Sequence, residues 1–204
     1  MKSAYDLTVA VVSSHVDPAL PALDISGLPL YAVQCADATS NQVIAEQEGN
    51  GLLKRMEDFG SVFLRLALGA SFLSAVGDRF GFWGAFGKAG VAWGDFSHFI
   101  AYTAKLNWFM PSATIPALAW AATFAETLLG IALVLGAFTR VAAFLSGLLL
   151  LLFALVMTFA LGPEAPLSFS VFSASAGAFL LATCSKYSWS LDSLRAERIL
   201  GGKK

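Results

Sequence analysis

The chain has 204 residues, of which 57% are hydrophobic and 13% charged, and its mean hydropathy is +0.69. Soluble domains carry about 25% charged residues, so this composition favours an integral membrane protein. The net charge of −1 offers no basic surface for nucleic acid, and two histidines are too few for the paired axial ligands of a membrane haem or a multi-histidine metal centre. We therefore expect a lipid bilayer as the main partner, with no nucleic acid and no metal site.

The first 55 residues differ in composition from the rest. Residues 1–55 contain scattered acids and three prolines but no sustained hydrophobic period, which predicts a poorly structured N-terminal extension. The apolar run at 7–12 is too short for a secretory signal. An alternative is that the start is mis-annotated, that translation begins at Met56, and that the preceding residues are never made.

Four long apolar stretches follow Met56, at residues 59–77, 114–135, 141–161 and 167–184. Each approaches or exceeds the roughly 20 residues that a helix needs to cross a hydrocarbon core of about 30 Å. The stretch 141–161 contains no charge at all, which a soluble helix rarely tolerates around its whole circumference. The sequence therefore predicts an all-α fold, an integral membrane four-helix bundle over residues 56–185, followed by a basic cytoplasmic tail over 186–204.

Basic residues in the connections predict how the bundle is oriented. With both termini in the cytoplasm, the external segments contain only Arg79, Lys88 and Lys105, and the other basic residues near the spans are internal. Lys and Arg are retained on the cytoplasmic side of a membrane. We expect a multi-pass protein of a bacterial-type cytoplasmic (inner) membrane, N-in and C-in, with up-down-up-down topology.

The connection between the first two spans, residues 82–113, is rich in aromatic side chains. From residue 95 to 109 its apolar positions recur at helical spacing, which predicts an aromatic interfacial helix between spans one and two. Such a helix could serve as an ordinary aromatic belt at headgroup depth or as a lid over a binding site. The aromatic residues are Phe82, Trp83, Phe86, Trp93, Phe96, Phe99, Tyr102, Trp108 and Phe109.

Two ionisable residues, Arg65 and Glu126, stand inside the predicted spans. A charge in the bilayer costs several kcal/mol unless it is paired, reaches the interface or meets water. Arg65 lies about 9 Å and Glu126 about 13 Å from the inner ends of their spans, so we predict that they form a buried polar pair. The pair could be structural, handle a proton or bind a polar head group such as a quinone carbonyl, and Arg65 could alternatively extend alone to the inner surface.

Polar residues also occur where the first span ends. Adjacent helical residues do not face each other, so Asp78 and Arg79 should bind different partners. We interpret them, with Trp83, Trp93 and His98, as candidates for the outer mouth of a site between spans one and two. Capping and contact with the membrane interface is the alternative role.

Four segments, 65–69, 75–81, 126–130 and 135–140, resemble the DoxX/DoxD family of small four-span membrane proteins. The resemblance implies a membrane subunit of a quinone-linked redox system, of the thiosulfate:quinone oxidoreductase type, with no covalently bound cofactor and a soluble redox partner subunit. The catalytic residues stay unassigned. The alternatives are a non-catalytic membrane scaffold or assembly protein and a conductor of protons or small solutes, and small residues along 170–182 leave a homodimer open.

Overall fold

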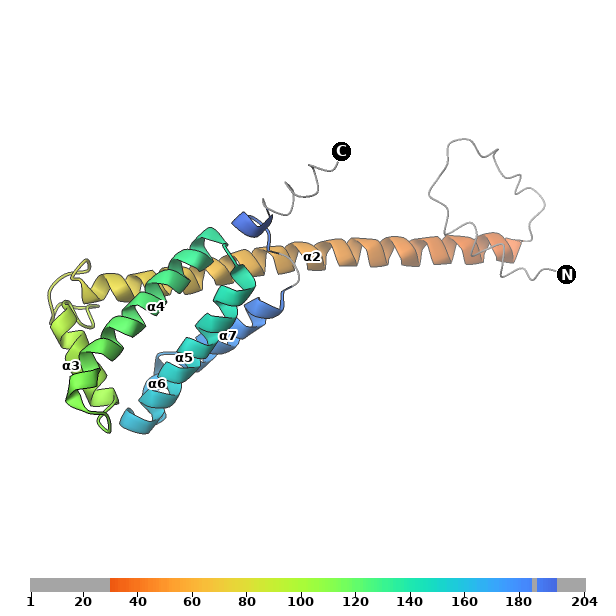
Figure 1. The fold of residues 1–204 in the computed structure, drawn as a ribbon. Helices are drawn as coiled ribbons and strands as arrows, with labels where there is room; N and C mark the ends of the chain where they lie inside the picture. The colour runs from red at the N-terminus through yellow and green to blue at the C-terminus, as the bar shows by residue number, and fades with distance from the viewer. Residues whose placement is uncertain (1–29, 185–186, 194–204) are drawn as a thin grey trace. The chain divides into compact units, whose positions relative to one another are not determined.

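The computed structural model describes the backbone of residues 30–184 and 187–193, and side chains from residue 49 onward within these ranges. The described part is helical and contains no strand (Figure 1). Its elements are α2 (Leu30–Arg79), α3 (Phe96–Leu106), the short 3-10 helix η1 (Ser112–Thr114), α4 (Ile115–Leu135), α5 (Thr139–Leu161), α6 (Glu164–Ser168) and α7 (Val171–Thr183).

The chain divides into two units, residues 1–55 and residues 56–204. Within the first unit, the predicted extension lies outside the described residues over 1–29, and over 30–55 the backbone is helical. No proline follows Pro29 before Pro111, and alanine, glutamine, glutamate and leucine favour a helix over 30–55. The predicted tail, 186–204, falls mostly outside the described residues.

Among the described residues, three helices are long and apolar enough to cross a membrane: Gly49–Arg79, Ser112–Leu135 and Thr139–Leu161. At 1.5 Å per residue, the 23 residues of α5 extend about 35 Å, slightly more than a hydrocarbon core. Only 28%, 28% and 22% of their most apolar windows are buried inside the protein, so most of each apolar surface faces outward. A lipid solvent suits such a surface, whereas water does not. The architecture is therefore that of a multi-pass membrane protein.

The fourth predicted span, 167–184, is not one continuous helix. The short helix α6 ends at Ser168, and α7 begins at Val171 after Ser170 adopts a left-handed conformation with φ 56°. Serine is a weak helix former because its hydroxyl competes for backbone groups, and the break falls within Ser-Phe-Ser. The 13 residues of α7 extend about 20 Å, which is too short to cross a bilayer alone.

Small residues let α7 pack closely along α5 (Figure 1). Ser175 donates a hydrogen bond of 2.8 Å to the carbonyl of Gly147 on α5, and the ring of Phe179 lies where a Cβ on Gly147 would have to be. Ala178 on α7 and Ala143 on α5 are fully buried. The small-residue ridge over 170–182 therefore forms part of the protein core.

A second close approach joins α2 to α4. A Cβ built on Gly69 would lie 2.9 Å from the carbonyl oxygen of Gly130, and one on Gly130 would lie 3.2 Å from the carbonyl oxygen of Gly69. The two backbones thus meet where neither residue has a side chain, one turn along α4 from Glu126. This contact fixes the position of Glu126 relative to α2.

Candidate functional site

Four charged side chains predicted as site residues are buried: Arg65, Asp78, Arg79 and Glu126, each at most 5% exposed. They form two groups. Asp78 and Arg79 lie at the end of the helices that carries the 82–113 connection, which we call the aromatic end, and Glu126 meets Arg79 from the middle of α4. Arg65 lies at the other end, near the turn between α4 and α5, which we call the turn end.

Arg79 and Glu126 form a buried salt bridge at the aromatic end. The Nη2 of Arg79 donates to both carboxylate oxygens of Glu126, at 2.7 and 2.6 Å, and its Nη1 donates to the hydroxyl of Thr123 at 2.9 Å. Thr123 and Glu126 are three residues apart on α4 and so share one face. The last residue of α2 is thereby bound to the middle of α4.

The predicted pairing of Arg65 with Glu126 is therefore wrong, and side-chain direction explains why. Side chains on a helix lean toward its N-terminus. On α4 this direction points the side chain of Glu126 toward the aromatic end. On the antiparallel α2 it points the side chain of Arg79 toward the turn end, so the two side chains meet. Arg65, also on α2, leans the same way as Arg79, toward the turn end, and therefore away from Glu126. Backbone depth alone therefore does not identify which arginine meets Glu126.

Aromatic rings cover the guanidinium of Arg79. Its Cζ lies 3.7 Å from the ring centroid of Phe99 on α3 and 5.4 Å from that of Trp93, and these two rings meet edge to face at 5.2 Å. A cation over aromatic faces is stabilised by their quadrupoles, more strongly where water is excluded. We call Thr123, Glu126, Arg79, Trp93 and Phe99 the polar centre.

Asp78 holds one of these rings in place. Its Oδ2 accepts hydrogen bonds of 2.9 Å from the backbone amides of Ala92 and Trp93. The prediction that Asp78 and Arg79 bind different partners is confirmed, but Arg79 belongs to the interior of the protein and not to an outer mouth. Within the described part of the chain, Asp78 Oδ1 and Arg79 Nε are buried without a hydrogen-bond partner.

The two other predicted mouth residues lie outside the polar centre. The indole of Trp83 donates to the carbonyl of Ser74 at 3.1 Å, and its side chain is largely exposed. His98 bonds Asp95 through Nδ1 at 2.8 Å and stacks on Phe86, with ring centroids 3.9 Å apart. Asp95 also accepts from the His98 amide and so caps α3. Both bonds favour its charged form, and the pKa of this carboxyl is lowered.

Arg65 belongs to a polar network at the turn end, which the sequence analysis missed. Its Nη2 donates to the carbonyl of Trp189 at 2.7 Å, and Gly136, in the left-handed conformation, leaves room for its Nη1. Asp192 accepts from the amides of Phe138 and Thr139 and from the Thr139 hydroxyl, and so caps α5. The partner of Arg65 is a carbonyl, which every residue carries and no sequence pattern reveals.

The fold and these two buried centres define the class of the molecule: a multi-pass membrane protein with an ion pair in its interior. Comparison with protein-family models, with curated proteins and with solved structures finds no match for this chain. Membership of the DoxX/DoxD family therefore stays a prediction from the sequence segments quoted above.

Proposed function

We propose that this chain is the membrane subunit of a quinone-linked redox system and that its polar centre receives the quinone head group. One observation carries the proposal: a buried arginine, Arg79, with an unpartnered Nε donor lies beneath aromatic rings inside an apolar bundle. A quinone offers carbonyl acceptors for such a donor and a flat ring for Trp93 and Phe99, and it can enter from the lipid.

The sequence resemblance supports the same assignment. Arg79 falls within the segment 75–81 and Glu126 within 126–130, two of the four segments that resemble the DoxX/DoxD family. A quinone takes two electrons and two protons on reduction. In this proposal a soluble partner or a small reductant such as thiosulfate supplies the electrons, and Glu126 lies where it can pass a proton to the bound head group.

We further propose that α6 and α7 together complete a fourth crossing of a bacterial-type inner membrane. The segment from Glu164 to Thr183 has enough residues to reach across, at about 30 Å, and its close packing on α5 supports a bundle of four. Both termini then lie on the cytoplasmic side, and α3 lies at the opposite interface.

A non-catalytic scaffold or assembly protein is the second candidate function. Both Glu126 oxygens already accept from Arg79, as in a pair that only holds helices together. The connection at the aromatic end also exposes large side chains, including Phe82 at 80% and Trp108 at 74%. These side chains could contact a partner protein as well as lipid.

Extraction of bound quinone from the gently purified full chain distinguishes the two functions. We expect quinone in the wild-type protein and a loss of about tenfold or more in the double variant R79Q/E126Q, which removes both charges of the pair together, so that neither is left buried without the other. The control is Lys105→Gln on the exposed side of α3, which should retain quinone. Absence of quinone from the wild type, or full retention by a folded double variant, contradicts the proposal and favours the scaffold.

A further inference from the structure

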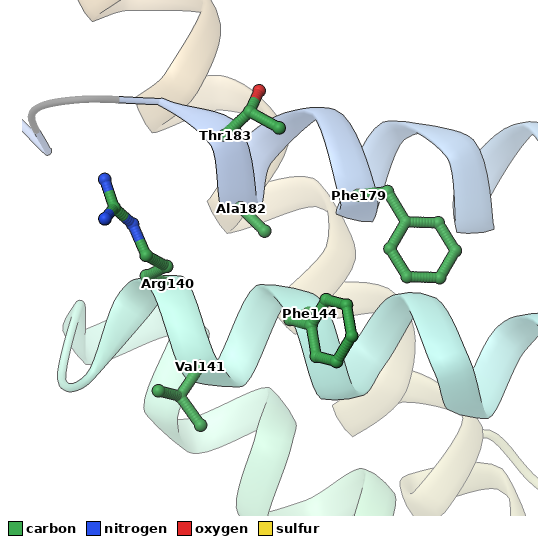
Figure 2. A pocket seen from close by; sticks show the side chains of 6 residues that line it. All are labelled: Arg140, Val141, Phe144, Phe179, Ala182 and Thr183. Carbon is green, nitrogen blue, oxygen red and sulfur yellow. The ribbon is translucent and has the colours of Figure 1, made fainter.

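A groove of about 460 Å³ lies between α5 and α7 at the turn end, away from the polar centre (Figure 2). Its volume is within the range of ligand pockets, about 300–1,000 Å³. Its walls are almost entirely apolar, apart from a cation at one end. The lining residues are Arg140, Val141, Phe144, Phe179, Ala182 and Thr183.

Two aromatic rings form the apolar part of this groove. Phe144 on α5 and Phe179 on α7 meet edge to face, with centroids 5.7 Å apart. The contact of Phe179 with Gly147 holds that ring against α5, and the small side chain of Ala182 leaves the space beside it open. The groove is thus formed by the packing of α7 on α5. It opens toward the lipid that would surround the membrane-spanning helix α5.

Arg140 gives the groove a positive end. Figure 2 shows its guanidinium beside the last turn of α7, apart from the two phenylalanine rings. It is exposed, donates a hydrogen bond of 3.0 Å from Nη2 to the carbonyl of Cys184, and also interacts with the hydroxyl of Tyr187. The carboxylate of Asp192 nearby is bound to the first amides of α5. Arg140 therefore keeps further donors for an anion at the level where α5 begins.

We propose that this groove binds one anionic phospholipid, with its phosphate at Arg140 and an acyl chain along Val141, Phe144, Phe179 and Ala182. α5 begins with Thr139 and Arg140 and continues without a charge, so its first turn lies at headgroup depth and the groove beyond it lies among acyl chains. Arginine pairs with phosphate through two parallel hydrogen bonds, and basic pockets between membrane helices select anionic head groups.

Native mass spectrometry of the detergent-purified full chain tests this site. We compare retention of phosphatidylglycerol with that of phosphatidylcholine carrying the same acyl chains. The wild type should retain the anionic lipid about fivefold better, which is the effect of one basic contact at a membrane surface. Arg140→Gln should remove the preference, Arg140→Lys should keep most of it, and Ala182→Leu should lower retention of both lipids. Lys105→Gln, at the aromatic end, should change nothing.

Several outcomes overturn the inference. These are equal retention of both lipids by the wild type, an unchanged preference in Arg140→Gln, unchanged retention in Ala182→Leu, and displacement of the lipid by glycerol 3-phosphate, which has no acyl chain. Displacement by an added quinone would also overturn it, because the groove would then be a quinone site. Circular dichroism checks that each variant is folded, and Ala182→Leu tests the groove without touching any polar group.

Discussion

Arg79 combines hydrogen bonds, a salt bridge and contacts with aromatic rings in the interior of the protein. It binds both oxygens of Glu126 and the hydroxyl of Thr123, and it lies over the ring of Phe99. Each interaction compensates part of the cost of keeping a charge in an apolar interior. Loss of Arg79 leaves the carboxylate of Glu126 buried without a partner. This lowers the stability more than replacing both side chains of the pair would.

The first prediction concerns this pair. Arg79→Gln or Glu126→Gln alone should lower the free energy of unfolding by about 3 kcal/mol, and the double variant should lose much less than the sum. Denaturant unfolding in detergent measures both. The matched control cycle combines Arg65→Gln with Glu126→Gln. Because the partner of Arg65 is Trp189, the losses of unfolding free energy in these two variants should add. Additive losses for Arg79 and Glu126, or coupling between Arg65 and Glu126, contradict the observed pairing.

The second prediction concerns the cap of α3. The pKa of Asp95 is lowered in the folded protein because its carboxylate accepts from the amide and ring of His98. The stabilisation is therefore complete above the unfolded pKa and is lost as pH falls through the lower, folded pKa. Carboxyl-carbon NMR of the full chain should show Asp95 titrating with a pKa below the ordinary value of 3.8. Asp95→Ala should speed amide exchange at His98, and a normal titration would contradict the cap.

At the scale of elements, the α2–α4 contact depends on two glycines that face each other. Gly69→Leu should separate the helices, because its side chain would meet the Gly130 carbonyl and the side chain of Val134. We expect a loss of stability of about 2–4 kcal/mol, as for overpacking at a backbone contact, measured by thermal unfolding in detergent. Gly60→Leu, on the same helix with open space around it, is the control and should be nearly neutral. Equal effects contradict this packing.

Sequence reasoning works for α4 and α5 because run length and hydropathy are properties of the chain itself. The predicted stretches 114–135 and 141–161 nearly coincide with these helices. The break at Ser170 was missed because hydropathy averages over a window and does not register a single backbone conformation. The start of α2 at Leu30 was missed because a polar helical segment lacks the apolar run used to find spans.

For the site, the sequence identifies which residues are unusual but not which of them meet. Arg65, Asp78, Arg79 and Glu126 were all singled out by their position near or inside spans, and all are buried. Their partners depend on side-chain direction and on loops that return to the bundle. The loop residue Trp93 is bound by Asp78, and Trp189, after α7, is bound by Arg65. Neither leaves a signal in one sequence.

For the whole molecule, the number of crossings determines where the termini lie. Four crossings put residues before and after the bundle on the same side, and three put them on opposite sides. We expect single cysteines at positions 54 and 188, in a background lacking Cys35 and Cys184, to be labelled by an impermeant thiol reagent only after the cytoplasmic side is opened. Labelling of position 54 from one side of the membrane and of position 188 from the other would contradict the fourth crossing.

Photolabelling is the sharpest test of the proposal that the Arg79–Glu126 centre binds a quinone. A photoreactive azidoquinone is added to the full chain in liposomes, and the labelled peptides are identified by mass spectrometry. We expect labels on the peptides that contain Trp93, Phe99 and Thr123; unlabelled quinone should compete for these labels, and they should be absent from R79Q/E126Q. Labelling confined to the Phe144–Phe179 groove, or unaffected by that double variant, would contradict it.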